Sequence, residues 1–555
     1  RNRNRTPQPL PQPHPAAAIP RAMSRLSGQC SRATRGKEPW RQQPKLRFGL
    51  KVHAKITDGR VLARGEHCGN EQQGYLGPVI DGKVPYIATT SRADFMSAFN
   101  KRVNFYTPDR VHRDIRGTSR KLIWKLTPKV HSTIEWDPEL YRSWLNQFDS
   151  AKQARMEREY KNQGLQKIGD YSRKEIFTKI ESLVKDHDTV APRVIFKGTD
   201  YYNMISGPMF KVLMERFKAC ENIMPELQFL LAYKQHTPQI VEFLETSKGN
   251  CGRAKSWIEA DFSSNDKSQV KDVQELEIMF MKRLGAPNWF LDLHKASNTF
   301  WAYNTKYGVS AMVQNQLATG ATDTTFRNSF WNLCIFYCWM KKYNVNARVA
   351  ILGDDMLACL DRRVRRAAYH YEAVARLAKM DAKVTTGKHL HNMHFLSKHF
   401  VPVMRGENSH VMLPFIGKVL AKFNARPNCN QGVSDDEYMA GKALSACYEF
   451  RYCHVIRDLF VERANYHLRR SGGKYSLEGV SYNVRVFAVH KGLIESMLDG
   501  STSWPDLVTS EDLSLFWQTI ADLTYSDLLP LIRRVILGVH YELLDHVPLQ
   551  SLRDY

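Results

Sequence analysis

The chain has 555 residues, 43% of them hydrophobic and 11% aromatic, a composition that excludes wholesale disorder. Its ten cysteines are irregularly spaced and it has no run of 18 apolar residues, so we expect neither a disulfide scaffold nor a membrane-spanning helix. Lys and Arg exceed Asp and Glu by 24, which predicts a polyanionic partner such as nucleic acid but does not distinguish an enzyme from a binding protein.

Residues 1–47 differ in composition from the rest of the chain. They carry eleven Lys and Arg residues but a single acid, Glu38, and six prolines fall within the first 20 residues. Proline cannot donate a backbone hydrogen bond, and few apolar side chains are present to form a core. We therefore expect a disordered basic arm.

From about Phe48 onward the composition is that of a folded protein. Residues 110–186 are highly charged with helical spacing, and residues 203–247 predict two helices with an apolar stripe. Residues 255–360 alternate short β-like runs with longer helical ones, whereas residues 434–555 look almost wholly helical. This order of elements predicts an α+β fold.

The segment Ala347–Leu360 contains two β-prone apolar runs separated by Gly353-Asp354-Asp355. Glycine supplies the backbone freedom that a tight turn needs, so this segment predicts a hairpin with two carboxylates at its tip. An ordinary acidic loop is the alternative interpretation. It is the weaker one, because an exposed acidic turn does not require a buried apolar hairpin to carry it.

A second pair of carboxylates lies upstream. A short β-like run ends at Asp261, Asp266 follows five residues later, and a helical stretch then continues through Leu284. Carboxylates at the ends of neighbouring strands can hold Mg²⁺, and two such ions can activate a 3′-hydroxyl and stabilise a leaving diphosphate. Helix N-capping by aspartate is the alternative that this segment alone leaves open.

Between these segments, Thr319-Gly320 forms a loop that leads into a predicted helix. Thr324 and Asn328 are four residues apart, so they lie on one face of that helix. Hydroxyl and amide side chains on one face suit hydrogen bonding to a sugar. An N-cap on a buried helix would explain the loop but not the polar face.

In this order, the three segments resemble motifs A, B and C of the RNA-dependent RNA polymerases of positive-strand RNA viruses. The intervals also fit, with 59 residues from Asp261 to Gly320 and 34 from Gly320 to Asp354. The run Asp266-Lys-Ser-Gln269 is similar to motif A of the alphavirus-like group, and Pro192-Arg193-Val-Ile195 is similar to motif F of tombusviruses and nodaviruses. Three motifs in one order are a more specific signal than any one of them.

The resemblance implies roles for particular residues. Asp261 and Asp354 would hold Mg²⁺, or Mn²⁺ in its place, with Asp355 assisting. Residues 395–400 resemble motif E, which grips the primer strand. The residues implied for nucleotide binding are Arg193, Lys197, Asp266, Gly320, Thr324 and Asn328, and the motif D lysine that would protonate the leaving diphosphate is Lys383, with Lys379 as its rival.

The resemblance implies a right-hand polymerase with an α+β fold. We expect fingers over residues 48–254, a palm built on a small antiparallel sheet over residues 255–415 with a fingers insertion at about 270–310, and a mostly helical thumb over residues 416–555. Such a protein would extend an RNA 3′ end from nucleoside triphosphates on an RNA template. This is the chemistry of viral genome replication and transcription.

Two other functions stay open. A reverse transcriptase shares the palm chemistry, although its usual aromatic-x-Asp-Asp turn is missing, because Leu352-Gly353 precedes Asp354. A non-catalytic RNA-binding protein would also explain the net charge of +24. The expected partners are template and nascent RNA, nucleoside triphosphates, and viral or host replication proteins. The expected location is the host cytoplasm, either free or attached peripherally to membrane-bound replication complexes.

Overall fold

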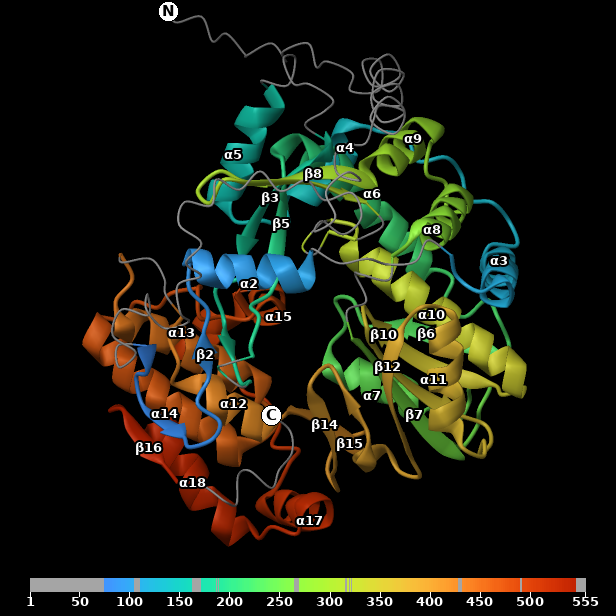
Figure 1. The fold of residues 1–555 in the computed structure, drawn as a ribbon. Helices are drawn as coiled ribbons and strands as arrows, with labels where there is room; N and C mark the ends of the chain where they lie inside the picture. The colour runs from blue at the N-terminus through green and yellow to red at the C-terminus, as the bar shows by residue number, and fades with distance from the viewer. Residues whose placement is uncertain are drawn as a thin grey trace, which may run out of the picture.

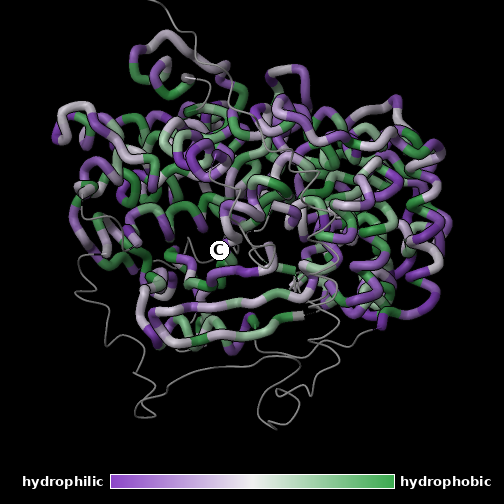
Figure 2. Tube along the Cα trace, turned by 90° about the horizontal axis from the view of Figure 1, so that it is seen from above, coloured by the Kyte–Doolittle hydropathy of each residue, from purple (hydrophilic) through white to green (hydrophobic). Residues whose placement is uncertain are grey.

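Helices and several small sheets form an α+β fold, as the sequence predicts (Figure 1). The predicted basic arm lies outside the described residues, as do Asp266 and Thr319. Figure 2 shows hydrophobic segments concentrated toward the middle of the trace and hydrophilic ones along its outer rim. The computed structural model describes residues 74–103, 110–161, 171–185, 187, 189–263, 269–314, 317–318, 320, 322–427, 432–489 and 492–545.

The largest sheet has five strands in the order β12-β7-β11-β10-β6. All neighbouring strands are antiparallel except β6 and β10, which run parallel. The predicted hairpin around Gly353 is confirmed, because β10 and β11 are joined by that turn. The strands are β6 (Leu227–Leu231), β7 (Ser256–Ser263), β10 (Ala347–Leu352), β11 (Asp355–Leu360) and β12 (Asp381–Gly387).

Side chains of this sheet alternate between two buried faces. On β11, Met356 belongs to the core formed with the long helices, whereas Leu357 belongs to the core formed with α7 (Thr237–Glu245). Because the alternation has a period of two, Asp355 and its cross-strand neighbour Asp261 lie on the Leu357 face. Burial on both faces explains why the central strands β10 and β11 read as largely apolar runs.

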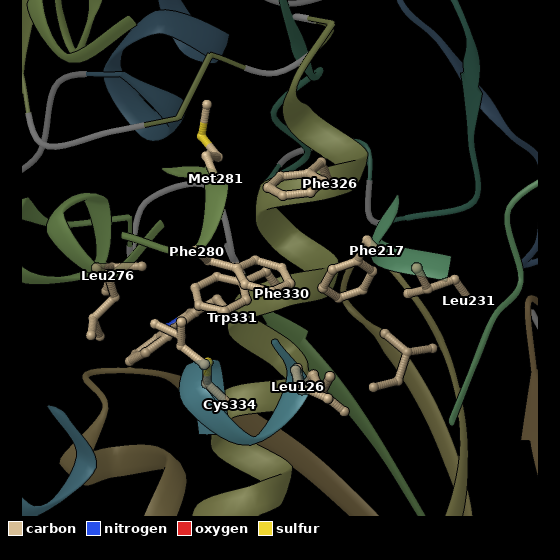
Figure 3. Close-up of a cluster of buried hydrophobic side chains, with 14 of the residues drawn as sticks. Leu126, Phe217, Leu231, Leu276, Phe280, Met281, Phe326, Phe330, Trp331 and Cys334 are labelled. Carbon is tan, nitrogen blue, oxygen red and sulfur yellow. The ribbon is translucent and has the colours of Figure 1, made fainter. Parts of the chain in front are cut away.

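Helix α10 (Thr324–Tyr343) packs on one face of this sheet and is buried along most of its length. Phe330 stacks on Phe280 with 4.7 Å between ring centroids, and Phe326 meets Phe217 at 5.5 Å. Figure 3 shows this aromatic cluster around the α10 ribbon. Burying one phenylalanine contributes about 1.5–3 kcal/mol, so several together fix the helix firmly against its neighbours.

A second sheet has four strands in the order β5-β3-β8-β9, and β8 brings to it part of the expected insertion at 270–310. Its strands are β3 (Arg173–Thr178), β5 (Val194–Gly198), β8 (Thr299–Asn304) and β9 (Val309–Gln314). The helices of the same half of the chain are α2 (Arg92–Arg102), α3 (Arg113–Leu126), α4 (Pro138–Leu145), α5 (Ser150–Lys161), α6 (Asp200–Lys218), α8 (Lys271–Arg283) and α9 (Asn288–Ser297).

Beyond the five-stranded sheet, a three-stranded sheet leads into a mainly helical region, which gathers at the lower left of Figure 1. The three strands are β13 (His394–Phe395), β14 (Lys398–Pro402) and β15 (His410–Pro414), and α11 (Ala367–Leu377) precedes them. The helices are α12 (Ile416–Phe423), α13 (Asp435–Glu449), α14 (His454–Ser471), α15 (Tyr482–Val484), α16 (Leu493–Leu498), α17 (Ser510–Ala521) and α18 (Tyr525–Leu537). The helical prediction for this region is confirmed for most of its described residues.

One element of the five-stranded sheet is missing from the prediction. The two helices expected over residues 203–247 are present as α6 and α7, but β6 lies between them. β6 is five residues long and pairs with β10, which is more than 100 residues away in the chain. Its conformation is therefore fixed by a distant partner, and the sheet takes one strand from the range expected for the fingers.

The two ends of the described chain meet where β1 (Pro78–Ile80) pairs in parallel with β16 (Glu542–Leu544). Asn424, which follows α12, donates from Nδ2 to the carbonyl oxygen of Pro78 at 2.8 Å and to that of Val535 at 3.0 Å. The Asn424 side chain is fully buried, so solvent cannot take its place. One buried amide thus fastens an N-terminal segment to the C-terminal helices.

Asn424→Ala should destabilise the fold, because it leaves two buried carbonyl oxygens without their donor, at a cost of about 1–3 kcal/mol each. Urea unfolding followed by tryptophan fluorescence should show a lower midpoint than for wild type. Leu543→Ala on β16 is the control, since Leu543 is half exposed. Equal midpoints for the two variants would show that the junction of the chain ends does not depend on Asn424.

Candidate active site

Strand pairing brings the predicted carboxylates together at one end of the five-stranded sheet. Asp261 on β7 lies opposite Asp355 on β11 and, on its other side, opposite Lys383 on β12. Directly opposed residues in an antiparallel pair have Cβ atoms about 5 Å apart. Asp354 is the next residue along, in the turn between β10 and β11. Four residues predicted to act in catalysis therefore lie in one small area.

The turn that carries Asp354 has two residues between the paired strand ends. Leu352 pairs with Asp355, and Gly353 has a φ of +59°, in the left-handed region that favours glycine. A β-carbon at Gly353 would meet no atom within 4 Å, so backbone conformation and not space makes glycine the favoured residue. Gly353 lets the chain reverse within two residues, as in the tightest hairpins.

Two polar side chains of α10 hold this turn. Ser329 Oγ accepts a hydrogen bond from the Gly353 amide at 2.9 Å. Asn332 Nδ2 donates to the carbonyl oxygen of Gly353 at 2.9 Å and to that of Asp355 at 3.3 Å. Both side chains are fully buried. Neither was predicted from the sequence, although Asn332 follows Asn328 by four positions and so continues its polar helix face.

A neighbouring hairpin contacts the same carboxylates. Leu396 and Ser397 join β13 to β14, and the Leu396 amide donates to Asp355 Oδ2 at 2.7 Å. Both turn residues have positive φ, at 54° and 57°, which costs a non-glycine residue about 1–3 kcal/mol. Glu259 on β7 accepts from the His394 amide at 2.8 Å and fastens the start of the hairpin. The segment that resembles motif E is thus tied to both strands that carry the carboxylates.

Burial and mutual repulsion raise the pKa values of the carboxylates Asp261 and Asp355. Burial raises the pKa of Asp355 to about 7, while the Leu396 amide opposes the shift and the charge of Asp261 adds to it. Burial also raises the pKa of Asp261, although the charge of Lys383 opposes the shift. Carboxylates held side by side disfavour their ionised forms, and a cation between them would favour those forms.

The chemistry of these residues suits a hard divalent cation. Mg²⁺ and Mn²⁺ prefer carboxylate oxygens, which Asp261, Asp354 and Asp355 supply from one edge of the sheet. A cation there would relieve the repulsion that contributes to the raised pKa of Asp355. Within the described ranges, no group of three or more His, Cys, Asp or Glu side chains is gathered closely enough to hold a metal ion by itself. The fit therefore rests on the type and placement of the carboxylates.

Arg193, just before β5, places a cation near Asp354. Its Nε donates to Glu181 Oε1 at 2.6 Å, and this hydrogen bond, with the charge of Asp354, raises the pKa of Arg193. Lys179 also pairs with Glu181, at 3.5 Å between Nζ and Oε2. Burial lowers the pKa of Lys422 on α12 to about 8, and the charges of Arg193 and Lys179 add to that shift. Lys179 and Lys422 were not predicted, because they join Arg193 only through the fold.

Lys197 has a different surrounding from Arg193. It is exposed on β5, where it lies opposite Glu175 of β3. Burial lowers the pKa of Lys152 on α5, and the charge of Lys197 adds to that shift. Lys197 thus faces solvent opposite Glu175, whereas Arg193 is the residue of this segment whose charge acts together with that of Asp354.

The predicted sugar-binding residues lie at the start of α10. Thr324 Oγ1 donates to a backbone carbonyl of the preceding loop at 3.0 Å. Asn328 Oδ1 accepts from Gln269 Nε2 at 3.1 Å, which links α10 to the segment containing Asp266. Gly320 has a φ of +91° and packs on β5, so the loop needs glycine for its backbone conformation. Asp266 lies outside the described residues, so its place in the predicted network stays a prediction.

A buried ion network anchors the N-terminal end of α10. Asp323 Oδ2 lies 3.0 Å from Arg327 Nη1 and 3.1 Å from His294 Nε2 on α9. Arg327 Nε donates to Glu277 Oε2 on α8 at 2.6 Å. Burial opposes ionisation of Asp323, but the hydrogen bond with His294 and the charge of Arg327 hold its pKa well below the usual range. Breaking a buried pair of this kind costs several kcal/mol, so the network fixes where the helix begins.

A family model described as RNA dependent RNA polymerase matches residues 60–477, three quarters of the chain. The match includes Asp261, the loop at Gly320 and the turn at Gly353. The chain belongs to the RNA-dependent RNA polymerase family. Membership confirms the resemblance drawn from the three motifs and identifies the chain as an RNA-directed RNA polymerase.

Curated relatives of this polymerase are viral replication proteins. The chain is 25% identical over 344 residues to the replicase large subunit of Tobacco rattle virus, in both strain SYM and isolate PpK20. That alignment covers 58% of the chain and 19% of the relative. A second relative, the non-structural replication polyprotein of Eggplant mosaic virus, is 30% identical over 105 residues, or 19% of the chain and 5% of the relative. The polymerase therefore spans at most about a fifth of the length of these relatives.

Asn332→Leu should lower the rate of nucleotide addition by about ten- to a hundredfold with little change in the KM for nucleoside triphosphates, because the turn loses its donor and the carboxylates lose alignment. Primer-extension kinetics measure both quantities. Cys334→Ala, equally buried on α10, controls for altered helix packing. Equal rates in the two variants would show that the turn does not depend on Asn332.

Asp355 makes stability pH-dependent when no divalent cation is bound. Its folded-state pKa of about 7 exceeds the ordinary value of 3.8, so between these values the folded protein keeps a proton that the unfolded chain has lost. The stability from this proton is complete below about pH 4 and is lost as the pH rises through 7. Urea unfolding in EDTA from pH 4 to 8 should show a smaller decline for Asp355→Asn than for wild type.

The exposed Asp381→Asn variant on β12 is the control for this pH series, and it should keep the wild-type profile. Coincident profiles for Asp355→Asn and wild type would contradict a raised pKa at Asp355.

Proposed function

We propose that this chain synthesises RNA on an RNA template by adding nucleotides from nucleoside triphosphates to a 3′ end. The observation that carries the proposal is the register of β7 and β11, which sets Asp261 against Asp355 beside the Gly353 turn in a member of this family. Family membership favours this activity over reverse transcription and over RNA binding without catalysis.

The arrangement of sheets supports a right-hand layout. We assign the five-stranded sheet with α10 and α11 to the palm, the four-stranded sheet and its helices to the fingers, and the helices from α12 onward to the thumb. Compared with the boundaries expected from sequence, β6 joins the palm through β10, and β1 joins the thumb through β16. β8, from the insertion at 270–310, extends the fingers sheet by pairing with β3.

Asp261 and Asp354 would hold divalent cations, with Asp355 assisting, and Mg²⁺ is the ion we propose, with Mn²⁺ as a substitute. When bound, such ions activate the 3′-hydroxyl and stabilise charge on the leaving diphosphate. The contribution of the chain itself is positioning. The α10 side chains hold the turn, and the Leu396 amide orients the Asp355 carboxylate.

The cations around Glu181 would neutralise the incoming triphosphate. Arg193 is half exposed while paired to Glu181, so it can present its remaining donors to phosphate with its orientation already fixed. Lys179 and Lys422 would add charge beside it, and Lys197, exposed on β5 opposite Glu175, would act at longer range. Lys383 would protonate the leaving diphosphate, and its register opposite Asp261 favours it over Lys379 for this role.

Asp354→Ala should abolish primer extension on an RNA template while leaving RNA affinity nearly unchanged, because affinity comes from many Lys and Arg contacts with phosphates. Extension is followed with labelled primer and Mg²⁺, and affinity by filter binding. Asp381→Ala, an exposed carboxylate change on β12, should extend normally. Full extension by purified Asp354→Ala protein would remove the Gly353 turn from the site.

The ribose 2′-hydroxyl would be recognised by Asn328 with Thr324 and Asp266. A site built to bond a hydroxyl leaves buried polar groups unpaired when that hydroxyl is missing, so wild type should strongly prefer ribonucleotides. Asn328→Ala should lower kcat/KM for ribonucleotides more than for deoxyribonucleotides. A proportional fall for both substrates would mean that Asn328 only fastens α10 to Gln269.

The relatives named as replicase and replication polyprotein support a role within a larger replication assembly. We propose that the polymerase acts there on template and nascent RNA with viral or host replication proteins. We place this activity in the host cytoplasm, with peripheral attachment to membranes. In the part of the chain that the structure describes, no helix has the length and apolar character needed to cross a membrane.

A further inference from the structure

A second group of cations lies at the far end of the palm sheet. Between β11 and α11 the chain reads Asp361-Arg-Arg-Val-Arg-Arg366, and all four arginines are exposed. Lys341 and Lys342, in the last turn of α10, are exposed beside them. Arg362 donates to the backbone carbonyl of Tyr343, which ties the loop to the end of α10. Six cations therefore gather on this surface, with Asp361 in the loop and Glu226 near Lys341 as the neighbouring acids.

Aromatic rings and cations alternate across this group. Lys342 Nζ lies 5.9 Å from the Tyr343 ring centroid, and Tyr343 stacks on His370 at 4.8 Å. His370 meets Tyr369 edge-on at 5.5 Å, and the Arg366 guanidinium lies 5.2 Å from the Tyr369 ring. Tyr369 is 55% exposed. We call this surface the distal patch, and it consists of Lys341, Lys342, Tyr343, Arg362, Arg363, Arg365, Arg366, Tyr369 and His370.

The backbone at the distal patch is held in a costly conformation. Arg366 precedes α11 with a φ of +53°, in the left-handed region that a non-glycine residue adopts only at a cost. Strain of this kind is found most often at functional sites. Here it accompanies an arrangement in which the arginines stay exposed and Tyr369 presents its ring.

The distal patch is separate from the candidate active site. On the β10–β11 hairpin, the pair Leu352–Asp355 is at the catalytic end and the pair Ala347–Leu360 is at the distal end. Strands rise about 3.3 Å per residue, so the two ends are roughly 17 Å apart. A nucleotide on the distal patch is therefore remote from the reacting 3′ end.

We propose that the distal patch binds single-stranded RNA, with phosphates on its Lys and Arg side chains and a base stacked on Tyr369. Single-strand sites combine a cationic surface with exposed rings, because every base has a face that can stack. An anionic membrane needs only the cations, and the ladder of rings between them favours RNA. This site goes beyond the catalytic function: it holds template or product away from the chemistry.

The test compares RNA affinity across salt concentrations for two matched triple variants. Lys342→Gln with Arg363→Gln and Arg365→Gln should weaken binding of a labelled single-stranded RNA and reduce the log–log salt slope by roughly 2, since each phosphate contact contributes about 0.7. The control carries the same charge loss at exposed thumb positions, as Arg469→Gln, Lys474→Gln and Arg533→Gln. Equal changes of the salt slope in the two triple variants would mean that the effect comes from net charge alone, and this result would overturn the proposal.

Tyr369→Ala separates stacking from charge. It should weaken RNA binding by about tenfold with an unchanged salt slope, because only a ring is lost. Unchanged affinity would overturn the stacking assignment. Loss of binding to phosphatidylserine vesicles in the Lys342, Arg363 and Arg365 triple, with RNA binding intact, would instead assign the patch to an anionic membrane.

The Lys342, Arg363 and Arg365 triple variant and Tyr369→Ala should both extend a short self-priming RNA hairpin at the wild-type rate, because such a substrate does not reach the distal patch. Hairpin extension separates the proposed polymerase activity from the proposed RNA binding at the distal patch. Failure of the wild type to extend the hairpin would count against the polymerase activity, whatever the binding data show. Slow extension by the patch variants alone would mean that the patch acts through the active site, and it would overturn a separate binding role.

Discussion

The hydrogen bonds that the Gly353 turn makes with the side chains of Ser329, an acceptor, and Asn332, a donor, are the interaction on which the rest of the site depends. They are effective because α10 cannot shift: aromatic packing fixes its middle, and the buried ion pairs of Asp323 and Arg327 fix its start. A buried amide that lost these partners would cost about 1–3 kcal/mol, so helix and turn stabilise each other. The register of β7 with β11 then sets the spacing of the carboxylates.

The unfavourable free energy of this arrangement, from charge repulsion and backbone strain, is concentrated at the same edge of the sheet. Asp355 is half-buried beside the more exposed Asp261, and two non-glycine residues in the adjoining hairpin turn have positive φ. Lys383 and the Leu396 amide offset part of the repulsion without removing it. Carboxylates that repel one another alone and are stabilised together by a divalent cation are what a metal-dependent active site requires, because the repulsion is relieved only when the site is occupied.

Local sequence was sufficient to predict the hairpin at Gly353, the strand ending near Asp261 and the helix beginning at Thr324, because apolar runs and glycine determine these elements over short distances. It could not reveal Ser329, Glu259, Lys179 or Lys422, since each acts through a contact with an element distant in the chain. β6 was missed for the same reason: five residues acquire strand conformation by pairing with β10. Lys197 shows the converse, because a motif match alone did not reveal that it lies exposed on β5 opposite Glu175 of β3.

Cleavage of the polypeptide by hydroxyl radicals from bound Fe²⁺, substituted for Mg²⁺, tests most directly whether the carboxylates at this edge form the cation site. Radicals react close to the ion, so fragment ends report which backbone segments surround it. Ends clustered near residues 261 and 354, lost together in Asp261→Asn and Asp354→Asn proteins and suppressed by excess Mg²⁺, are the predicted result. Cleavage centred on other segments, or unchanged in both variants, would contradict the account.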